Sequence, residues 1–248
     1  TLCPTPFVTV ALVQNGNVIN TQELMEVVRK KSQQDLTGEL GRGSSTDTAV
    51  ITALLGGADE YESLEEAALG ILPTLKGAFS LAFMDETTLY AARDPYGFRP
   101  LVLGRLSAGW VVASETAALD IVGATFVREI EPGEMLIINE NGPRSVRFAQ
   151  STPRGCIFEY VYLARPDTTI AGRSVNASRN EMGRVLAREH PVDADIVIAT
   201  PDSGTPAAIG YAQESGIPYA QGLVKNAYVG RTFIQPTQTM RQLGIRLK

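Results

Sequence analysis

A short polar turn, residues 202–205, carries the side chains in this sequence that are best suited to chemistry. The apolar run DIVIAT before the turn predicts a buried strand. The segment TPAAIGYAQESG, which begins at the last residue of the turn, predicts a helix. At the carboxyl end of a parallel strand, backbone N–H groups and the positive end of the next helix favour an anion. The pattern therefore indicates a site for a phosphate-like group, although the turn lacks the glycine and lysine spacing of a Walker A loop.

The residues of the turn have distinct chemical uses. Ser203 and Thr205 offer hydroxyl groups, and Gly204 has no Cβ to block the close approach of an anion. Asp202 has the wrong charge for a bare phosphate, but its carboxylate suits a ribose hydroxyl or a hydrated Mg²⁺ ion. The alternative is an ordinary strand-to-helix turn in which the Asp or Ser caps the helix.

A basic segment lies further along the chain. From residue 223 onwards there is no carboxylate, and the five cations are Lys225, Arg231, Arg241, Arg246 and Lys248. Arginine and lysine form charge-assisted hydrogen bonds with phosphate oxygens, and interspersed glycines allow such a segment to act as a lid. A solvated basic face is the alternative, but in combination with the turn these cations favour anion binding.

Composition limits the class of protein. The 248 residues are 44% hydrophobic and 20% charged, which suits one large domain or two modest ones. A net charge of −5 gives no chain-wide basic surface for nucleic acid, and no apolar run is long enough to cross a membrane. The two cysteines are too few for a disulfide framework, so we expect reduced thiols and a cytoplasmic location.

The first part of the chain predicts a mixture of helices and antiparallel strands. Hydrophobic periodicity and capping residues predict three helices, at residues 20–32, 46–57 and 63–75. Short β-like runs separated by turns follow, which together with the helices predict an α+β fold. In RDPYGFRPL, Arg93 and Asp94 can pair beside a turn, and we interpret this segment as architecture rather than catalysis.

The hydrophobic pattern changes near residue 153, where we expect a domain boundary. Beyond it, a helix at 175–190, the strand DIVIAT and the helix after the turn predict an α/β fold with a parallel sheet. The apolar residues Met182, Val185 and Leu186 are expected to face inward from the first of these helices.

Several longer stretches resemble the glutamine phosphoribosylpyrophosphate amidotransferase family. CIFEYVYLARPD, PDSGTPAAIGYAQESGIPY and KNAYVGRTFIQPTQTMRQLGIRLK are similar to its phosphoribosyltransferase domain; GAFSLAFMD, RDPYGFRPL, ASETAALD and EPGE are similar to its glutaminase domain. The resemblance implies that residues 1–153 form an N-terminal-nucleophile glutaminase, an αββα sandwich. It implies that residues 154–248 form the first part of a type I phosphoribosyltransferase parallel sheet. The family uses ammonia from glutamine to displace pyrophosphate from phosphoribosyl pyrophosphate (PRPP), giving 5-phosphoribosylamine, the first step of de novo purine biosynthesis.

In the glutaminase part, the resemblance assigns roles to three residues. Asn15 and Gly16 of QNGN would form the oxyanion hole, and Asp47 would bind the amino group of glutamine. The chemistry is consistent, because a side-chain amide and a backbone N–H both donate hydrogen bonds to a developing oxyanion. Relatives usually have His where Gln14 stands. The alternatives are an Asn-Gly hairpin for QNGN and a helix N-cap for Asp47.

In the second part, the resemblance makes the polar turn a pyrophosphate loop that binds PRPP through Asp202, Ser203, Gly204 and Thr205, with Ser203 helping to bind Mg²⁺. The segment KNAYVGRTF, residues 225–233, would be a hood that closes over PRPP through Lys225 and Arg231. Cys156 of CIFEY aligns with one ligand of a [4Fe–4S] cluster in one branch of the family, and a buried structural cysteine is the alternative.

The family pattern is incomplete at both ends of this sequence. No N-terminal nucleophilic cysteine is present, since the first residue is Thr1, and neither Thr1 nor Cys3 has the surrounding motif. The paired-Asp loop that would hold the ribose 5-phosphate is also missing. We therefore expect an excerpt of an amidophosphoribosyltransferase that lacks its nucleophile segment and whose activity in isolation is open.

Two other functions are compatible with these residues. One is a non-catalytic PRPP- or nucleotide-binding relative, and the other is a different N-terminal-nucleophile amidotransferase, which would not explain PDSGTPAAIGYA. For the family reading, the implied partners are glutamine, PRPP and purine nucleotides as feedback inhibitors. The implied assembly is a homotetramer or a dimer, without nucleic acid or membrane.

Overall fold

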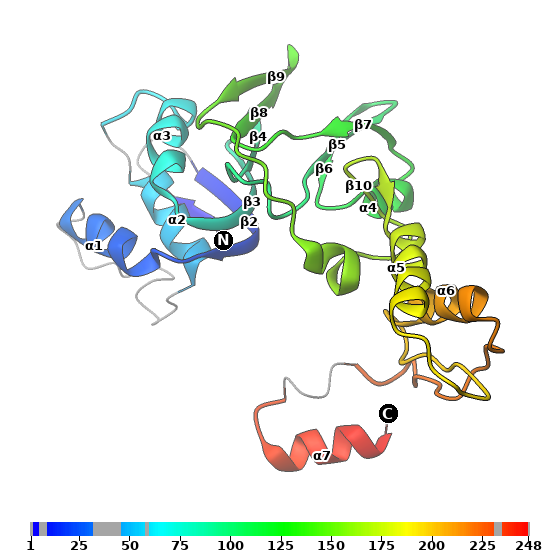
Figure 1. Ribbon diagram of the computed structural model, residues 1–248. Coiled ribbons are helices and arrows are strands. Elements are labelled where there is room, and N and C mark those ends of the chain that lie inside the picture. The colour runs from blue at the N-terminus through cyan, green and yellow to red at the C-terminus, as the bar shows by residue number, and fades with distance from the viewer. Residues whose placement is uncertain (1, 5–8, 32–45, 58–59, 231–234, 248) are drawn as a thin grey trace. The chain divides into compact units, whose positions relative to one another are not determined.

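The computed structural model describes residues 2–4, 9–31, 46–57, 60–230 and 235–247 (Figure 1). The chain divides into two compact units, residues 1–156 and 157–248, close to the boundary expected near residue 153. Among the described helices, none combines the length and the apolar character that crossing a lipid bilayer requires.

Two antiparallel sheets and four helices make up the first unit in the described ranges. The larger sheet has the order β1-β2-β3-β4-β8-β9, with strands Leu2–Pro4, Thr9–Val18, Gly77–Met84, Leu89–Arg93, Glu134–Asn139 and Gly142–Arg147. The smaller sheet has the order β6-β5-β7, with strands Gly109–Ala113, Val102–Leu106 and Thr125–Glu129. The α-helices are α1 (Thr21–Lys31), α2 (Asp47–Gly56), α3 (Leu64–Ile71) and α4 (Thr116–Ile121). A short 3₁₀ turn, Leu72–Thr74, follows α3.

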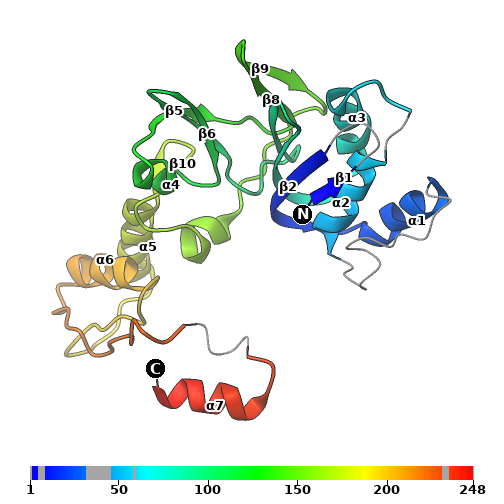
Figure 2. The same cartoon turned by 180° about the vertical axis from the view of Figure 1, so that it is seen from behind.

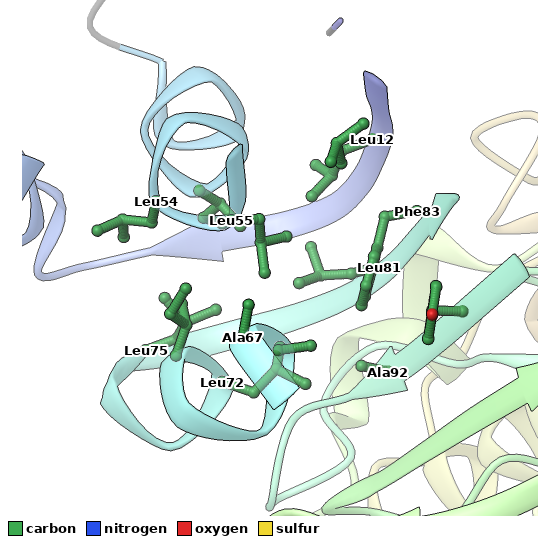
Figure 3. Close-up of a cluster of buried hydrophobic side chains, with 14 of the residues drawn as sticks. Leu12, Leu54, Leu55, Ala67, Leu72, Leu75, Leu81, Phe83 and Ala92 are labelled. Carbon is green, nitrogen blue, oxygen red and sulfur yellow. The ribbon is translucent and has the colours of Figure 1, made fainter. Parts of the chain in front are cut away.

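The main core lies between the larger sheet and helices α1 to α3. Residues at alternate positions of β2 point to the same face, and Leu12, opposite Phe83 of β3, is fully buried. Figure 3 shows leucines of α2, Leu54 and Leu55, beside the side chains of β2 and β3. Ser63 caps α3 as expected, because its side chain accepts a hydrogen bond from the N–H of Glu66.

The opposite face of the larger sheet is covered by the smaller one. Buried residues from both sheets, including Leu136 of β8 and Leu103 of β5, form a second apolar cluster. On the far side of the smaller sheet, Leu119 of α4 packs against Val102 of β5. The first unit therefore has the order helices, sheet, sheet, helix, in agreement with the αββα arrangement that the family resemblance implies.

Arg93 and Asp94 do not pair with each other, contrary to expectation. Asp94 is fully buried and accepts hydrogen bonds from the N–H groups of Phe79, Tyr96 and Phe98. Arg93 instead donates to backbone carbonyls and forms an ion pair with Glu129 at 3.3 Å. Burial raises the pKa of Asp94, although the hydrogen bonds from these N–H groups oppose that shift.

The second unit is mainly helical in the described ranges. Its elements are a π-helical turn (Glu159–Leu163), a hairpin of β10 (Thr169–Ile170) and β11 (Arg173–Ser174), and helices α5 (Val175–Glu189), α6 (Thr205–Ser215) and α7 (Gln238–Leu247). The expected strand at 195–200 is present only as one parallel bridge, between Val197 and Tyr219. That bridge has the direction expected of a parallel sheet, but it is too short to form one.

Helices α5 and α6 pack at very close range through glycine (Figure 2 shows the pair from behind). A Cβ on Gly183 would lie 1.9 Å from the carbonyl oxygen of Ala207, and a Cβ on Gly210 would lie 1.9 Å from that of Asn180. The buried residues of α5 are Val175, Arg179, Gly183 and Ala187, and the two small ones lie where α6 approaches. Our expectation for Val185 and Leu186 was wrong, because both side chains are exposed, by 36% and 49%.

Gly210→Ala should destabilise the second unit. Helix propensity favours alanine by about 1 kcal/mol, but the clash with the α5 backbone should cost roughly 1–3 kcal/mol more than that gain. A lowered melting temperature in calorimetry checks this. The control is Gly230→Ala, where a Cβ meets nothing within 4 Å. Equal melting temperatures for the two variants would contradict the close packing.

Glu134→Gln should lower stability in a pH-dependent way. Glu134 is 4% exposed; burial acts to raise its pKa, but hydrogen bonds from Arg128, Ser145 and the N–H of Glu131 outweigh it and lower the pKa. A depressed pKa gives stability that is present above the unfolded value, about 4.3, and is lost as pH falls through the folded value. We expect a loss of about 1–2 kcal/mol at pH 7 that shrinks below about pH 4.

Denaturant unfolding across pH 3 to 7 measures this difference. Glu26→Gln, on the exposed face of α1, is the matched control and should change little at any pH. If the loss of unfolding free energy in Glu134→Gln is independent of pH, the carboxylate charge does not contribute to stability.

Candidate functional site

Asn15 and Gly16 lie inside β2, not at a turn. They face Ser80 and Phe79 of β3 in the strand register, so the alternative of an Asn-Gly hairpin is wrong. Gly16 has a φ of +143°, and a Cβ there would lie 2.1 Å from the carbonyl oxygen of Ala78. Only glycine fits this close approach of the two strands.

The side chain of Asn15 is held from a distant part of the sequence. Its Nδ2 donates a hydrogen bond to the hydroxyl of Ser114, just beyond β6, over a distance of 3.2 Å. A primary amide has two N–H bonds, so a second one is still available to donate to a ligand. Asn15 is therefore oriented and still has a donor to offer.

Asp47 is the first residue of α2 and is tied to β2. The N-cap of this helix is Thr46, whose hydroxyl accepts from the N–H of Ala49, so the alternative of Asp47 as N-cap is wrong. The Oδ2 atom of Asp47 accepts from Nε2 of Gln14 at 2.8 Å and from the N–H of Val18 at 2.9 Å. A partly buried carboxylate at a helix N-terminus is suited to binding a cationic group.

Gln14, Thr48 and Ser114 complete this arrangement, and sequence reasoning gave none of them a role. The hydroxyl of Thr48 donates to Oε1 of Gln14 at 3.0 Å, and the N–H of Thr48 donates to Oδ1 of Asp47 at 2.9 Å. Gln14 and Asp47 are 33 positions apart, and Asn15 and Ser114 are 99 apart. No local sequence signal reports contacts of that separation.

The polar turn of the second unit precedes α6, as expected. The N–H groups of Gly204 and Thr205 donate to the carbonyls of Thr200 and Asp202, so both are used within the turn. In the described part of the chain, the N–H and hydroxyl of Ser203 make no hydrogen bond and can serve a ligand. Gly204 is required for the turn itself, because a Cβ there would lie 2.7 Å from the carbonyl oxygen of Thr200.

A pocket of about 190 Å³ opens beside this turn. Its lining includes Asp202, Thr205, Tyr219, Gln221 and Lys225. Lys225 reaches across, with its Nζ 2.6 Å from Oδ2 of Asp202. The structure thus brings together Asp202, Thr205 and Lys225, and it leaves space for a small ligand among them.

Some expected site residues are not placed by the structure. Arg231 and Thr1 lie outside the described residues, whereas Cys3 belongs to the short strand β1. Cys156 is a free, half-buried thiol and does not lie in a strand.

The two expected metal groups differ in how well these residues fit them. Asp202 and Ser203 supply a carboxylate and a hydroxyl oxygen, which fit the preference of Mg²⁺ for oxygen ligands. A [4Fe–4S] cluster needs four thiolates, and in the described ranges no three His, Cys, Asp or Glu residues gather as a metal site would require. Cys156 supplies one thiol of that set.

Comparisons with known proteins point in one direction. A family model described as a glutamine amidotransferase domain matches residues 4–121. An amidophosphoribosyltransferase of Mycobacterium tuberculosis is 65% identical over 96% of this chain and 45% of its own length. The amidophosphoribosyltransferase of Bacillus subtilis is 46% identical over 96% of this chain and 48% of its own length.

Solved structures agree with these relatives. The glutamine PRPP amidotransferase of B. subtilis, in complex with ADP and GMP, has a TM-score of 0.86 at 43% identity. That match covers 98% of this chain and 52% of the solved one. The chain thus spans about half the length of the curated relatives it matches. The chain is a relative of the amidophosphoribosyltransferases, similar to them along nearly its whole length.

Proposed function

We propose that the chain provides the glutaminase part and the pyrophosphate-binding part of an amidophosphoribosyltransferase. In that reaction, ammonia released from glutamine displaces pyrophosphate from PRPP and gives 5-phosphoribosylamine. The observation that carries the proposal is the separation of two sites between two folded units. One unit holds a carboxylate and an amide donor on β2 and α2, and the other holds an anion-sized pocket before α6.

In the first unit, Asp47 would bind the α-ammonium group of glutamine through its ionised carboxylate. When a cysteine thiolate attacks the side-chain amide of glutamine, negative charge develops on the carbonyl oxygen. The remaining N–H of the Asn15 amide, already oriented by Ser114, and the backbone N–H of Gly16 would donate to that oxygen. Each such donor is worth about 3 kcal/mol in the transition state.

In the second unit, Ser203 and Thr205 would donate to the diphosphate of PRPP, and Lys225 would leave Asp202 to bind a phosphate oxygen. Arg231, outside the described residues, is proposed to assist Lys225. Mg²⁺, held by Ser203 and Asp202, would neutralise charge on the leaving diphosphate. In an alternative role, Asp202 would accept a hydrogen bond from a ribose hydroxyl of PRPP after Lys225 has moved away.

The proposals for feedback inhibition, oligomeric state and cellular location rest on the relatives. The B. subtilis structure contains ADP and GMP, which supports purine nucleotides as feedback inhibitors here. We propose a homotetramer or dimer that acts in the cytoplasm. In the full-length protein, Cys156 would supply one of the four thiolates of a [4Fe–4S] cluster.

The direct test uses the full open reading frame that encodes this chain and follows pyrophosphate release from PRPP. Glutamine and ammonium should each support release, and glutamine should be hydrolysed to glutamate. Release with ammonium alone would remove the glutaminase part of the proposal. Release with neither would favour a non-catalytic PRPP-binding relative.

Asp47→Asn should weaken the use of glutamine but not of ammonium. The neutral amide loses a charge-assisted hydrogen bond of about 1.5–3 kcal/mol, so KM for glutamine should rise about 10- to 100-fold. The ammonium-dependent rate should be unchanged, because that nitrogen source bypasses the site. Asp120→Asn, on the exposed end of α4, is the control. An unchanged KM would contradict the role given to Asp47.

Lys225→Met should weaken binding of PRPP. The methionine removes the cation but keeps a side chain of similar length. The Kd for PRPP, measured by calorimetry with Mg²⁺ present, should rise about tenfold or more. Chelation of Mg²⁺ with EDTA should weaken binding further. Lys76→Met, which removes an exposed cation of the first unit, should leave Kd unchanged. Equal PRPP affinity for both lysine variants would exclude the pocket beside Asp202.

A further inference from the structure

We infer that Gln14 is a positioning residue of the glutamine site, which fixes the Asp47 carboxylate so that its Oδ1 atom receives the substrate ammonium. The inference rests on the proposed role of Asp47. Three observations carry it.

The first observation is that both ends of the Gln14 amide are used. Its Nε2 donates to Oδ2 of Asp47 at 2.8 Å, and its Oε1 accepts from the hydroxyl of Thr48 at 3.0 Å. A flipped amide would place its oxygen against the carboxylate oxygen and its NH₂ against the hydroxyl. The amide therefore has one preferred orientation, and that orientation directs a donor at Asp47.

The second observation is the unequal use of the two carboxylate oxygens. Oδ2 of Asp47 accepts two hydrogen bonds, from Gln14 and from the N–H of Val18. Within the described ranges, Oδ1 accepts one, from the N–H of Thr48. A carboxylate oxygen has about two lone-pair sites, so the remaining acceptor capacity lies mainly on Oδ1. That atom is the one able to receive an ammonium N–H.

The third observation is that Gln14 adjoins Asn15 on β2. Successive residues of a strand point to opposite faces, so Gln14 reaches Asp47 while Asn15 reaches Ser114. One short piece of β2 thus fixes the directions of both the Gln14 and the Asn15 side chains. Because Gln14 is uncharged and does not titrate, it orients Asp47 without adding a competing charge.

The test compares L-glutamine with its des-amino analogue, 5-amino-5-oxopentanoate, in calorimetric titrations of the full-length protein. Gln14→Met has a similar length and no hydrogen-bonding amide. It should weaken glutamine binding about tenfold and leave the affinity for the analogue within about twofold, because only glutamine uses Asp47. Val13→Thr, at an exposed position next to Gln14, is the matched control and should change neither affinity.

A second variant separates positioning from a general loss of structure. Gln14→Glu keeps the shape but places a like charge beside Asp47, so it should weaken glutamine binding more than Gln14→Met does. Both variants should keep the β2 fold, as judged by an unchanged affinity for the analogue.

The outcomes distinguish this inference from the proposed function. If Asp47→Asn weakens glutamine binding but Gln14→Met does not, the role of Gln14 is overturned and that of Asp47 stands. An equal loss for glutamine and the analogue would show that Gln14 is only structural, which also overturns the inference. If the wild-type protein binds neither compound, both the glutamine site and the inference are overturned.

Discussion

The pairing of β2 with β3 is the interaction on which the proposed glutamine site depends. This ladder extends past Gln14, Asn15 and Gly16, and it holds the chain straight where an Asn-Gly sequence would otherwise turn. The strands approach so closely that Gly16 is the only residue type that fits. With the backbone fixed, the Gln14 and Asn15 side chains have defined directions, and their partners Asp47 and Ser114 are reached from separate elements.

The pocket beside Asp202 depends on a different interaction, an ion pair. Its cation and its carboxylate neutralise each other, since Lys225 pairs with Asp202 at 2.6 Å. Both side chains are partly exposed, so this pair contributes little to stability and can be exchanged for contacts with a ligand. A diphosphate with Mg²⁺ would satisfy the same two groups by bringing both signs of charge.

Local patterns predicted local structure well. Ser63 was recognised as a helix cap because the cap and its N–H partner are three residues apart, and the helices around the polar turn were found from periodicity. The prediction that Val185 and Leu186 face inward from α5 was wrong. Gly183 of α5 and Gly210 of α6 permit a close backbone contact that no hydrophobic pattern shows. Gln14 and Ser114 were missed for a related reason, as their roles depend on partners far along the chain.

We propose that the two folded units bind two different substrates, and hydrogen exchange with peptide-level mass spectrometry can decide this. Addition of L-glutamine should slow amide exchange in peptides covering residues 14–18 and 47–50. Addition of PRPP with Mg²⁺ should slow it in peptides covering 200–206 and 223–230. Protection of the same peptides by both ligands, or protection confined to other regions, would show that the two units do not bind these substrates separately.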